Sequence, residues 1–328
     1  MAGLVLSGSA GIATLVALSA LNGAVAAIAF PASSAITPQT VPAPVLQQAN
    51  ALLRLSMNTS AILGATTGGV LVAVLGPGFG LVVDAGAYAL AALLFSRIRP
   101  ARQAVPRAAG AGVLADLRDG WAEFTSRRWT WVVVAQFAVV NAAFVGTAAV
   151  LGPVVADRTI GRAAYGFVLA AQAAGLVVGG LVALRWRPER PLRAGVALTA
   201  LSALPAVALA LTPTLTALLV AALLAGFAIE QFGVAWDVAL QQHVPPDRLA
   251  RVYSYDAVGS FVAIPLGQAA VGPVSTLVGT DVTLLGCAAA ICAATPAALA
   301  SRSVRQLRRQ PARAAVAHEV WRFGRAGP

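Results

Sequence analysis

Glu230 is the residue of this sequence best placed to do chemistry, because it is a carboxylate inside the apolar stretch 218–234. A charged carboxylate in the centre of a membrane costs about 2.5–3.5 kcal/mol, so it is expected to be neutral, paired or functional. Glu230 therefore predicts a site that carries a proton or binds a substrate. A water-accessible structural contact is an equally open interpretation, because Glu230 lies near the end of its apolar stretch.

Other polar side chains also lie in or beside apolar stretches. Three amides fall within them: Gln136, Asn141 and Gln172. They could line a cavity with Glu230, or they could hold neighbouring helices together. Three aspartates lie near the ends of such stretches, where helix caps or loop partners are the favoured interpretation: Asp84, Asp237 and Asp256.

Catalytic and metal-binding motifs are absent from the sequence. It has no Gly-rich phosphate loop with Lys, no G-x-S-x-G and no H-E-x-x-H. His243 and His318 show no metal-ligand pattern, and Cys287 and Cys292 are expected to be small apolar residues of the last helix. We therefore expect no enzyme, no metal site and no cofactor.

The elements that hold these residues must be membrane-spanning helices. The chain is 59% hydrophobic and 11% charged, with a mean hydropathy of +0.80, whereas a soluble domain carries about 25% charged residues. A spanning helix needs about 20 mostly apolar residues. After a stub at 1–8, nine stretches meet that length: 10–31, 55–75, 79–97, 129–152, 163–184, 194–211, 215–237, 255–278 and 281–300. The predicted fold class is an all-α polytopic bundle in the lipid bilayer.

The charge of +11 indicates topology rather than nucleic-acid binding. All 23 basic residues are arginine, and 21 of them fall on one side of the predicted bundle, with only Arg158 and Arg162 opposite. Because positive residues stay in the cytoplasm, the arginine side and the C-terminus are predicted to be cytoplasmic, in a plasma (inner) membrane. Arg54 is placed in a loop on that side.

An internal repeat divides the chain into two related halves. Gln39-x-Val41-Pro42-x-x-x-Leu46 recurs 203 residues later as Gln242-x-Val244-Pro245-x-x-x-Leu249. Repeats of this kind are typical of transporters. The predicted organisation is a partial N-terminal bundle of a stub and three helices at 1–97, a linker with an amphipathic helix at 98–128, a six-helix bundle at 129–301 and a basic tail at 302–328. The linker helix (Leu114, Leu117, Trp121 and Phe124 at helical spacing) either lies on the membrane surface or packs under the bundle.

Glycines at helical spacing predict closely packed helix faces. They form two groups: Gly64, Gly68 and Gly69, and Gly175, Gly179 and Gly180. Close helix packing is the favoured interpretation, and a sliding contact between the halves is the alternative.

Four motifs carry a family resemblance: Phe30-Pro31-Ala32 through Val41-Pro42 to Ala49-Asn50-Ala51-Leu52; Ile62-Leu63-Gly64-Ala65-Thr66-Thr67-Gly68-Gly69; Val83-Asp84-Ala85; and Asp116-Leu117-Arg118-Asp119-Gly120-Trp121. Through these motifs the chain resembles the major facilitator superfamily. Within that superfamily it is similar to the bacterial efflux branch, which includes enterobactin exporters and macrolide efflux pumps. The second motif is similar to the antiporter motif Gly-Pro-x-x-Gly-Gly, with Ala65 in place of its proline.

The resemblance implies efflux of a small organic molecule, such as a drug or a siderophore, by alternating access. The antiporter-like motif implies coupling to protons, for which Glu230 is the candidate residue. Relative to this family the first two helices and most of the third are missing before Met1, so we expect an N-terminally truncated chain. The alternative is a non-transporting remnant, or a fragment of a split or misannotated gene.

Overall fold

The structure is a computed structural model that describes residues 1–98 and 113–310. Its regular elements are helical throughout these ranges: α1 (Ala2–Leu6), α2 (Ile12–Thr40), α3 (Leu46–Leu75), α4 (Pro77–Ser96), α5 (Val113–Ser126), α6 (Arg128–Gly146), α7 (Gly152–Arg158), α8 (Arg162–Arg185), α9 (Pro191–Leu198), α10 (Leu204–Leu211), α11 (Leu215–His243), α12 (Pro246–Phe261), α13 (Ala263–Val278), α14 (Thr280–Ala300) and α15 (Arg302–Arg305). The predicted all-α fold class is confirmed. The predicted tail beyond residue 310 and linker residues 99–112 lie outside the described part.

Nine helical segments of the described chain are long and apolar enough to cross a membrane, as predicted. Three of the nine segments consist of two consecutive helices joined at a short irregular turn. A π-helical turn at Thr147–Leu151 joins α6 to α7, a 3-10 turn at Thr199–Ala203 joins α9 to α10, and α12 meets α13 at Val262.

The predicted start and end of the first two spans were wrong. The first span was expected to end at residue 31, but α2 continues through Pro31 and Pro38 to Thr40. The second was expected to begin at residue 55, but α3 begins at Leu46. Proline is tolerated inside membrane helices because neighbouring groups satisfy the freed backbone. Arg54 therefore lies within a spanning helix and not in a loop.

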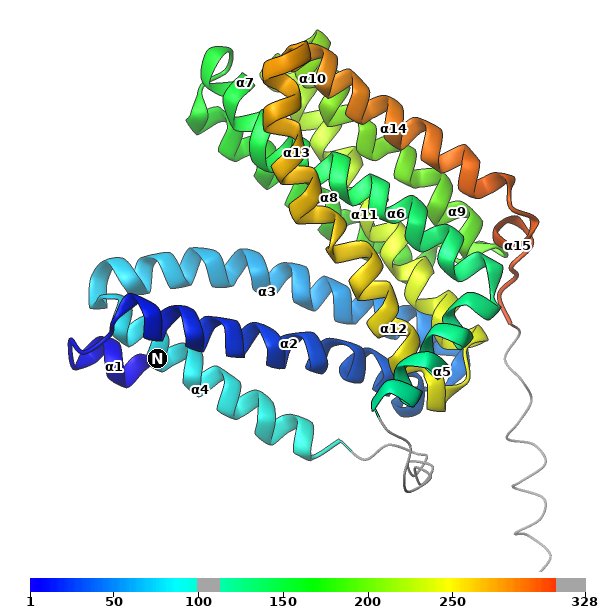
Figure 1. Ribbon diagram of the computed structural model, residues 1–328, viewed down its shortest axis with the longest axis horizontal. Helices are drawn as coiled ribbons and strands as arrows, with labels where there is room; N and C mark the ends of the chain where they lie inside the picture. The colour runs from blue at the N-terminus through cyan, green and yellow to red at the C-terminus, as the bar shows by residue number, and fades with distance from the viewer. Residues whose placement is uncertain (99–112, 311–328) are drawn as a thin grey trace, which may run out of the picture.

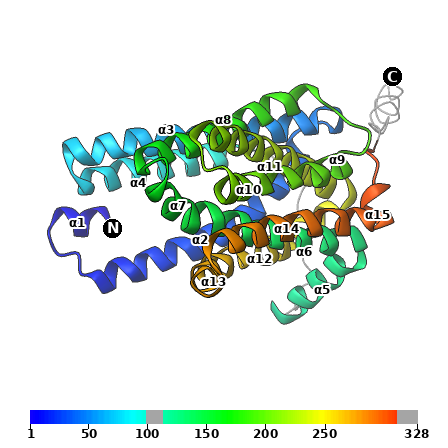
Figure 2. The same ribbon diagram turned by 90° about the horizontal axis from the view of Figure 1, so that it is seen from above.

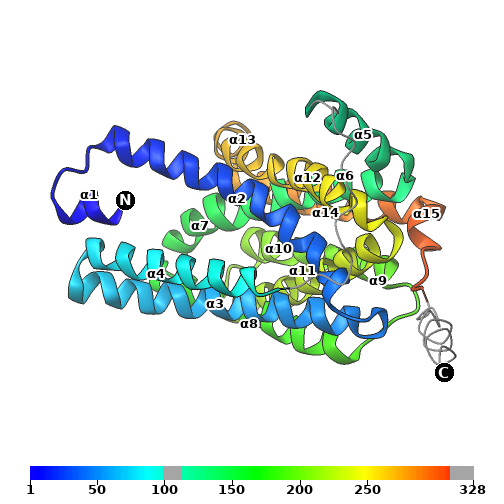
Figure 3. The same ribbon diagram turned by 90° about the horizontal axis from the view of Figure 1, so that it is seen from below.

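The helices form two groups that approach each other at one end. In Figure 1, α2, α3 and α4 run together below the bundle of α6–α14, and the two groups diverge toward α1 and α7. The views from above and below agree: α3 runs beside α8, and α2 crosses α12 (Figures 2 and 3). The groups meet at the end that carries Arg127, Arg185, Arg248 and Arg302, which we name the arginine-rich end.

Close packing within the larger group depends on glycines of α8 and α11. A Cβ atom on Gly175 would lie 2.1 Å from the carbonyl oxygen of Leu223, and one on Gly226 would lie 2.1 Å from that of Gln172. The two helix backbones therefore touch, as is typical of membrane helices with small residues at the contact.

The predicted close packing at Gly64, Gly68 and Gly69 is not found. Among the described residues, no atom of another helix lies within 4 Å of a Cβ atom built on any of the three. These glycines lie on a stretch of α3 whose side chains are mostly exposed, such as Leu63 and Val70. The physical reason is that α3 contacts the other helix group through its N-terminal half, from Gln47 to Asn58, and these glycines lie beyond it.

The linker helix α5 packs under the bundle rather than apart from it. Phe124 is buried, and its ring centroid lies 6.0 Å from that of Tyr255 on α12. Gly120 also faces the Tyr255 ring. This contact favours packing under the bundle over a position on the membrane surface. The side chains of Leu114 and Leu117 lie outside the part of the chain that the structure describes.

Candidate functional site

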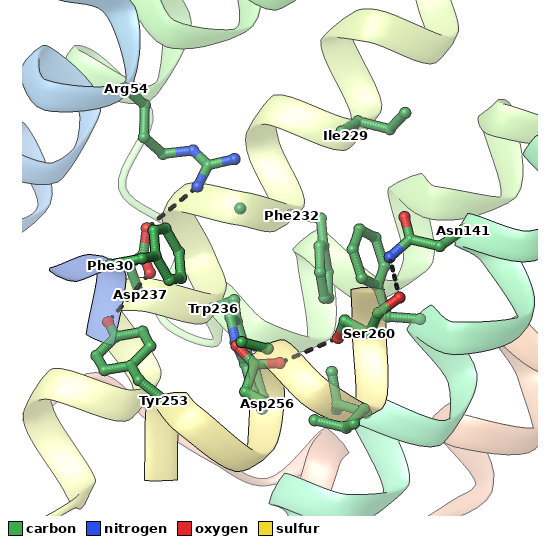
Figure 4. Close-up of a pocket in the computed structure, with 15 residues that line it drawn as sticks. Phe30, Arg54, Asn141, Ile229, Phe232, Trp236, Asp237, Tyr253, Asp256 and Ser260 are labelled. Atoms are coloured by element: carbon green, nitrogen blue, oxygen red, sulfur yellow. Dashed lines mark hydrogen bonds and ion pairs between the residues drawn. The ribbon is translucent and has the colours of Figure 1, made fainter. Parts of the chain in front are cut away.

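The guanidinium of Arg54 connects the two helix groups near the arginine-rich end. Arg54 of α3 places Nε 3.2 Å from Oε1 of Glu230 and Nη1 3.3 Å from Oδ2 of Asp237. Both carboxylates belong to α11, where a separation of seven residues is two helical turns and puts them on one face. Figure 4 shows Arg54 reaching toward Asp237 across the space between the helices.

Glu230 is therefore a paired carboxylate. Its side chain is 1% exposed, and its second oxygen, Oε2, accepts a hydrogen bond of 2.9 Å from Nδ2 of Asn58. Asn58 lies one turn after Arg54 on α3, so the two donors share a face. This pairing is how the structure meets the cost of placing a carboxylate in an apolar stretch.

Four more hydrogen bonds extend the pair into a network toward the arginine-rich end. Asn50 and Gln241 exchange amide hydrogen bonds of 2.7 and 3.1 Å. The hydroxyl of Tyr253 donates to Oδ1 of Asp237 at 3.1 Å and accepts from Nε2 of Gln241 at 3.2 Å. The network thus links α3, α11 and α12, and we name these residues the inter-half network: Asn50, Arg54, Asn58, Glu230, Asp237, Gln241 and Tyr253.

The space for Arg54 depends on Gly233. A Cβ atom there would lie 2.0 Å from Nη2 of the guanidinium. Any side chain at this position must displace Arg54 from its carboxylates, so Gly233 is part of the site although it contributes no polar group.

A cavity of about 250 Å³ lies beside this network, between the two helix groups. Its walls come from α2 and α3 on one side and from α6, α11 and α12 on the other. We name it the interface cavity (Figure 4). A second cavity of about 590 Å³ lies among α2, α3 and α4 and shares Phe30, Arg54 and Asp237 with the first.

The predicted amides are not gathered into one cavity. Asn141 lines the interface cavity, and its Nδ2 donates to the carbonyl of Ser260 at 3.1 Å. Gln136 is buried and donates to Oγ1 of Thr199 at 2.9 Å, which is a helix contact. Gln172 faces neither of the two cavities; its backbone carbonyl lies against Gly226.

The interpretation of Asp237 and Asp256 as caps or loop partners was wrong. Both line the interface cavity. Asp256 accepts hydrogen bonds from Nε1 of Trp236 at 2.9 Å and from Oγ of Ser260 at 3.1 Å. The sequence assigned them to helix ends because they lie near the ends of the predicted apolar stretches, whereas α11 and α12 continue past those stretches to His243 and back to Pro246.

A separate cluster holds α5 in place at the arginine-rich end. Glu123, 7% exposed, accepts hydrogen bonds from Arg127 at the start of α6 and from Arg248 at the start of α12. Burial by itself raises the pKa of Glu123, but the two guanidinium groups outweigh it and hold the pKa below its ordinary value. The charged form is thus the one that the folded state stabilises.

We expect the Glu123→Gln substitution to lower the melting temperature at pH 7 and to lose this effect in acid. A carboxyl group with a lowered folded-state pKa stabilises the protein fully above its ordinary pKa of 4.5, and this contribution is lost as the pH falls through the folded-state value. Melting curves of the two proteins, measured from pH 7 to pH 3 in one detergent, should begin to approach each other below about pH 4.5. A difference that stays constant over this range would contradict the assignment.

No metal site is found among the described residues, where no three His, Cys, Asp or Glu side chains come together. The polar groups of the site are instead arranged to hold two helix groups together beside a cavity.

Comparison with known proteins agrees with this architecture. A family model described as Major Facilitator Superfamily matches residues 1–268. No curated protein matches the chain. The match includes every residue of the inter-half network and the whole lining of the interface cavity. The chain therefore belongs to the Major Facilitator Superfamily, a family of membrane transporters.

Proposed function

We propose that the chain takes part in the efflux of a small organic molecule by alternating access between its two helix groups. The observation that carries this proposal is the inter-half network beside the interface cavity. Transporters of repeat architecture bind substrate between their halves and expose the site by rocking one half against the other. A contact that must form and break in such a cycle is expected at the interface, where Arg54, Glu230 and Asp237 lie.

The arginine distribution supports an orientation of the chain in the membrane. Because arginine-rich loops stay in the cytoplasm, the arginine-rich end and the C-terminus are assigned to the cytoplasmic side of the plasma membrane. The helix groups approach each other at that end and diverge at the other (Figure 1). This arrangement corresponds to a site closed to the cytoplasm, the state from which an exporter releases its substrate.

Proton coupling through Glu230 is the second part of the proposal. A proton on Glu230 would remove one of the two charges that Arg54 binds and would weaken the contact between α3 and α11. Protonation from one side of the membrane would then favour opening of the arginine-rich end.

We expect Glu230→Gln to abolish the stimulation of efflux by a proton gradient without changing the amount of protein in the membrane. Glutamine can still accept a hydrogen bond from Asn58 but carries no titratable charge. The measurement is expulsion of ethidium, Nile red and fluorescein, one cationic, one neutral and one anionic dye, from cells that produce the chain. Asp281→Asn, which changes an exposed carboxylate at the start of α14, is the matched control.

Two results would count against the proposal. Expulsion by Glu230→Gln with an unchanged response to the gradient would leave Glu230 with a structural role only. Expulsion of none of the three dyes by the unaltered chain would favour the alternative of a non-transporting protein.

A further inference from the structure

Asp256 differs from the other carboxylates of the interface because neutral groups are its hydrogen-bond donors. Trp236 and Ser260 donate to its two oxygens. Glu230 and Asp237, by contrast, both contact Arg54. Among the described residues, no arginine or histidine nitrogen lies within ion-pair distance of Asp256. A carboxylate that lines a cavity in this way leaves room for a cation supplied by a ligand.

The charge balance around the interface cavity is negative. Asp237 and Asp256 line the cavity, and Glu230 lies beside it. Arg54 is the one arginine in the lining, and it pairs with Glu230 and Asp237 and not with Asp256. If all four groups are charged, the surplus is two negative charges. Uncompensated charge is costly at membrane depth, so a bound cation is favoured here and a bound anion is disfavoured.

The walls of the cavity are unusually aromatic. Five of its fifteen lining residues are aromatic, Phe30, Phe137, Phe232, Trp236 and Tyr253, whereas aromatic residues make up 6% of the chain. Phe137 and Phe232 stack with centroids 4.3 Å apart, and Trp236 follows one turn along α11. Figure 4 shows the Trp236 ring next to Asp256, to which it donates a hydrogen bond, and Phe232 on the same helix. Ring faces attract organic cations, and quaternary ammonium groups are commonly bound by such aromatic walls.

The volume limits the size of the ligand. At about 250 Å³, the cavity lies just below the range of about 300–1,000 Å³ that is usual for ligand pockets. It has room for a group of one or two rings and not for a large macrocycle. The second cavity, which shares Phe30, Arg54 and Asp237, offers apolar space next to it.

We infer that the interface cavity binds small aromatic or lipophilic organic cations, with Asp256 as the counter-charge and Phe232 and Trp236 as the ring contacts. The inference names the substrate class of the transporter and so rests on the proposed function.

The test compares three benzene derivatives of similar size that differ in charge. Phenyltrimethylammonium is cationic, methyl phenyl sulfone is neutral and benzenesulfonate is anionic. Their dissociation constants are measured by ligand-observed NMR titration of the purified full chain in detergent. We expect the cation to bind about tenfold more tightly than the other two, the difference expected for one desolvated charge pair.

Variants locate the binding site. Asp256→Asn keeps the shape of the side chain and should weaken binding of the cation about tenfold, while Asp281→Asn should leave it unchanged. If Asp256→Asn does not fold, Phe232→Leu removes one ring and should weaken cation binding about threefold. Its matched control is Phe167→Leu, which changes an exposed ring on α8 outside the cavity.

Equal affinity for all three compounds, or cation binding that both site variants leave unchanged, would overturn the inference. The binding measurement does not depend on transport. Dye expulsion without selective cation binding would therefore refute only the substrate class, and selective binding without expulsion would refute only the proposed function.

Discussion

Replacing Arg54 with methionine is expected to destabilise the folded protein by about 3 kcal/mol, because it leaves Glu230 and Asp237 without their shared cation. The value is taken at the lower end of the usual range for breaking a buried pair. The Arg54 side chain is 31% exposed, so water in the cavities partly screens the carboxylates. The measurement is the shift of the thermal melting curve of the purified chain in one detergent.

Two comparisons make this prediction specific. Arg162→Met removes an arginine whose side chain is 79% exposed and which pairs with Asp157 at the opposite end; it should leave the melting curve almost unchanged, because exposed ion pairs contribute little to stability. Combining Arg54→Met with Glu230→Gln and Asp237→Asn removes the unpaired charges and should recover most of the lost stability. A melting curve of Arg54→Met that matches the unaltered protein would show that the inter-half network does not stabilise the fold.

Gly226→Ala is expected to reduce the yield of folded protein severely, although alanine is the better helix former by about 1 kcal/mol. The new methyl carbon would lie 2.1 Å from the carbonyl oxygen of Gln172, so α8 and α11 must move apart. Backbone atoms cannot rotate away as a side chain can, and overpacking of this kind typically costs about 1–3 kcal/mol or more.

Gly68→Ala is the matched control for this prediction. It makes the same change at a position where no described atom of another helix lies within 4 Å of the new carbon. The two variants are compared by the fraction that elutes as a single species in size-exclusion chromatography, where Gly68→Ala should equal or exceed the unaltered chain. An equal, high yield of Gly226→Ala would mean that the α8–α11 contact is looser than the structure describes.

The fold was predictable because a single strong signal, long apolar stretches separated by arginines, determines it. The nine spans follow from hydropathy alone. Their ends do not, because Pro31 and Pro38 indicate a loop in a soluble protein but are tolerated in a membrane helix. One misplaced helix end had a large consequence: it put Arg54 in a loop and so concealed the partner of Glu230.

The site was predictable only in part, because its residues come from distant segments. Glu230 was identified from its chemistry, and Asn141 from its position. A signal for the rest exists in hindsight: Asn50, Arg54 and Asn58 recur every four residues on α3 and form one polar face. No pattern in one sequence shows that this face meets Asp237 on α11 or that Asp256 lines the same cavity, because those contacts depend on tertiary packing.

The position of Arg54 also has a consequence for how the protein is made. Arg54 and Glu230 are 176 residues apart in the chain, and ribosomes add about 5–20 residues per second, so the first helix group waits about 10–35 s for its partner during synthesis. Throughout that interval α3 carries a guanidinium and two amide side chains that have not met their α11 partners. Nascent α3 must therefore stay at the translocon or the lipid headgroups, or beside a chaperone, until α11 emerges. The same arginine that joins the finished halves makes correct assembly depend on the late arrival of the second.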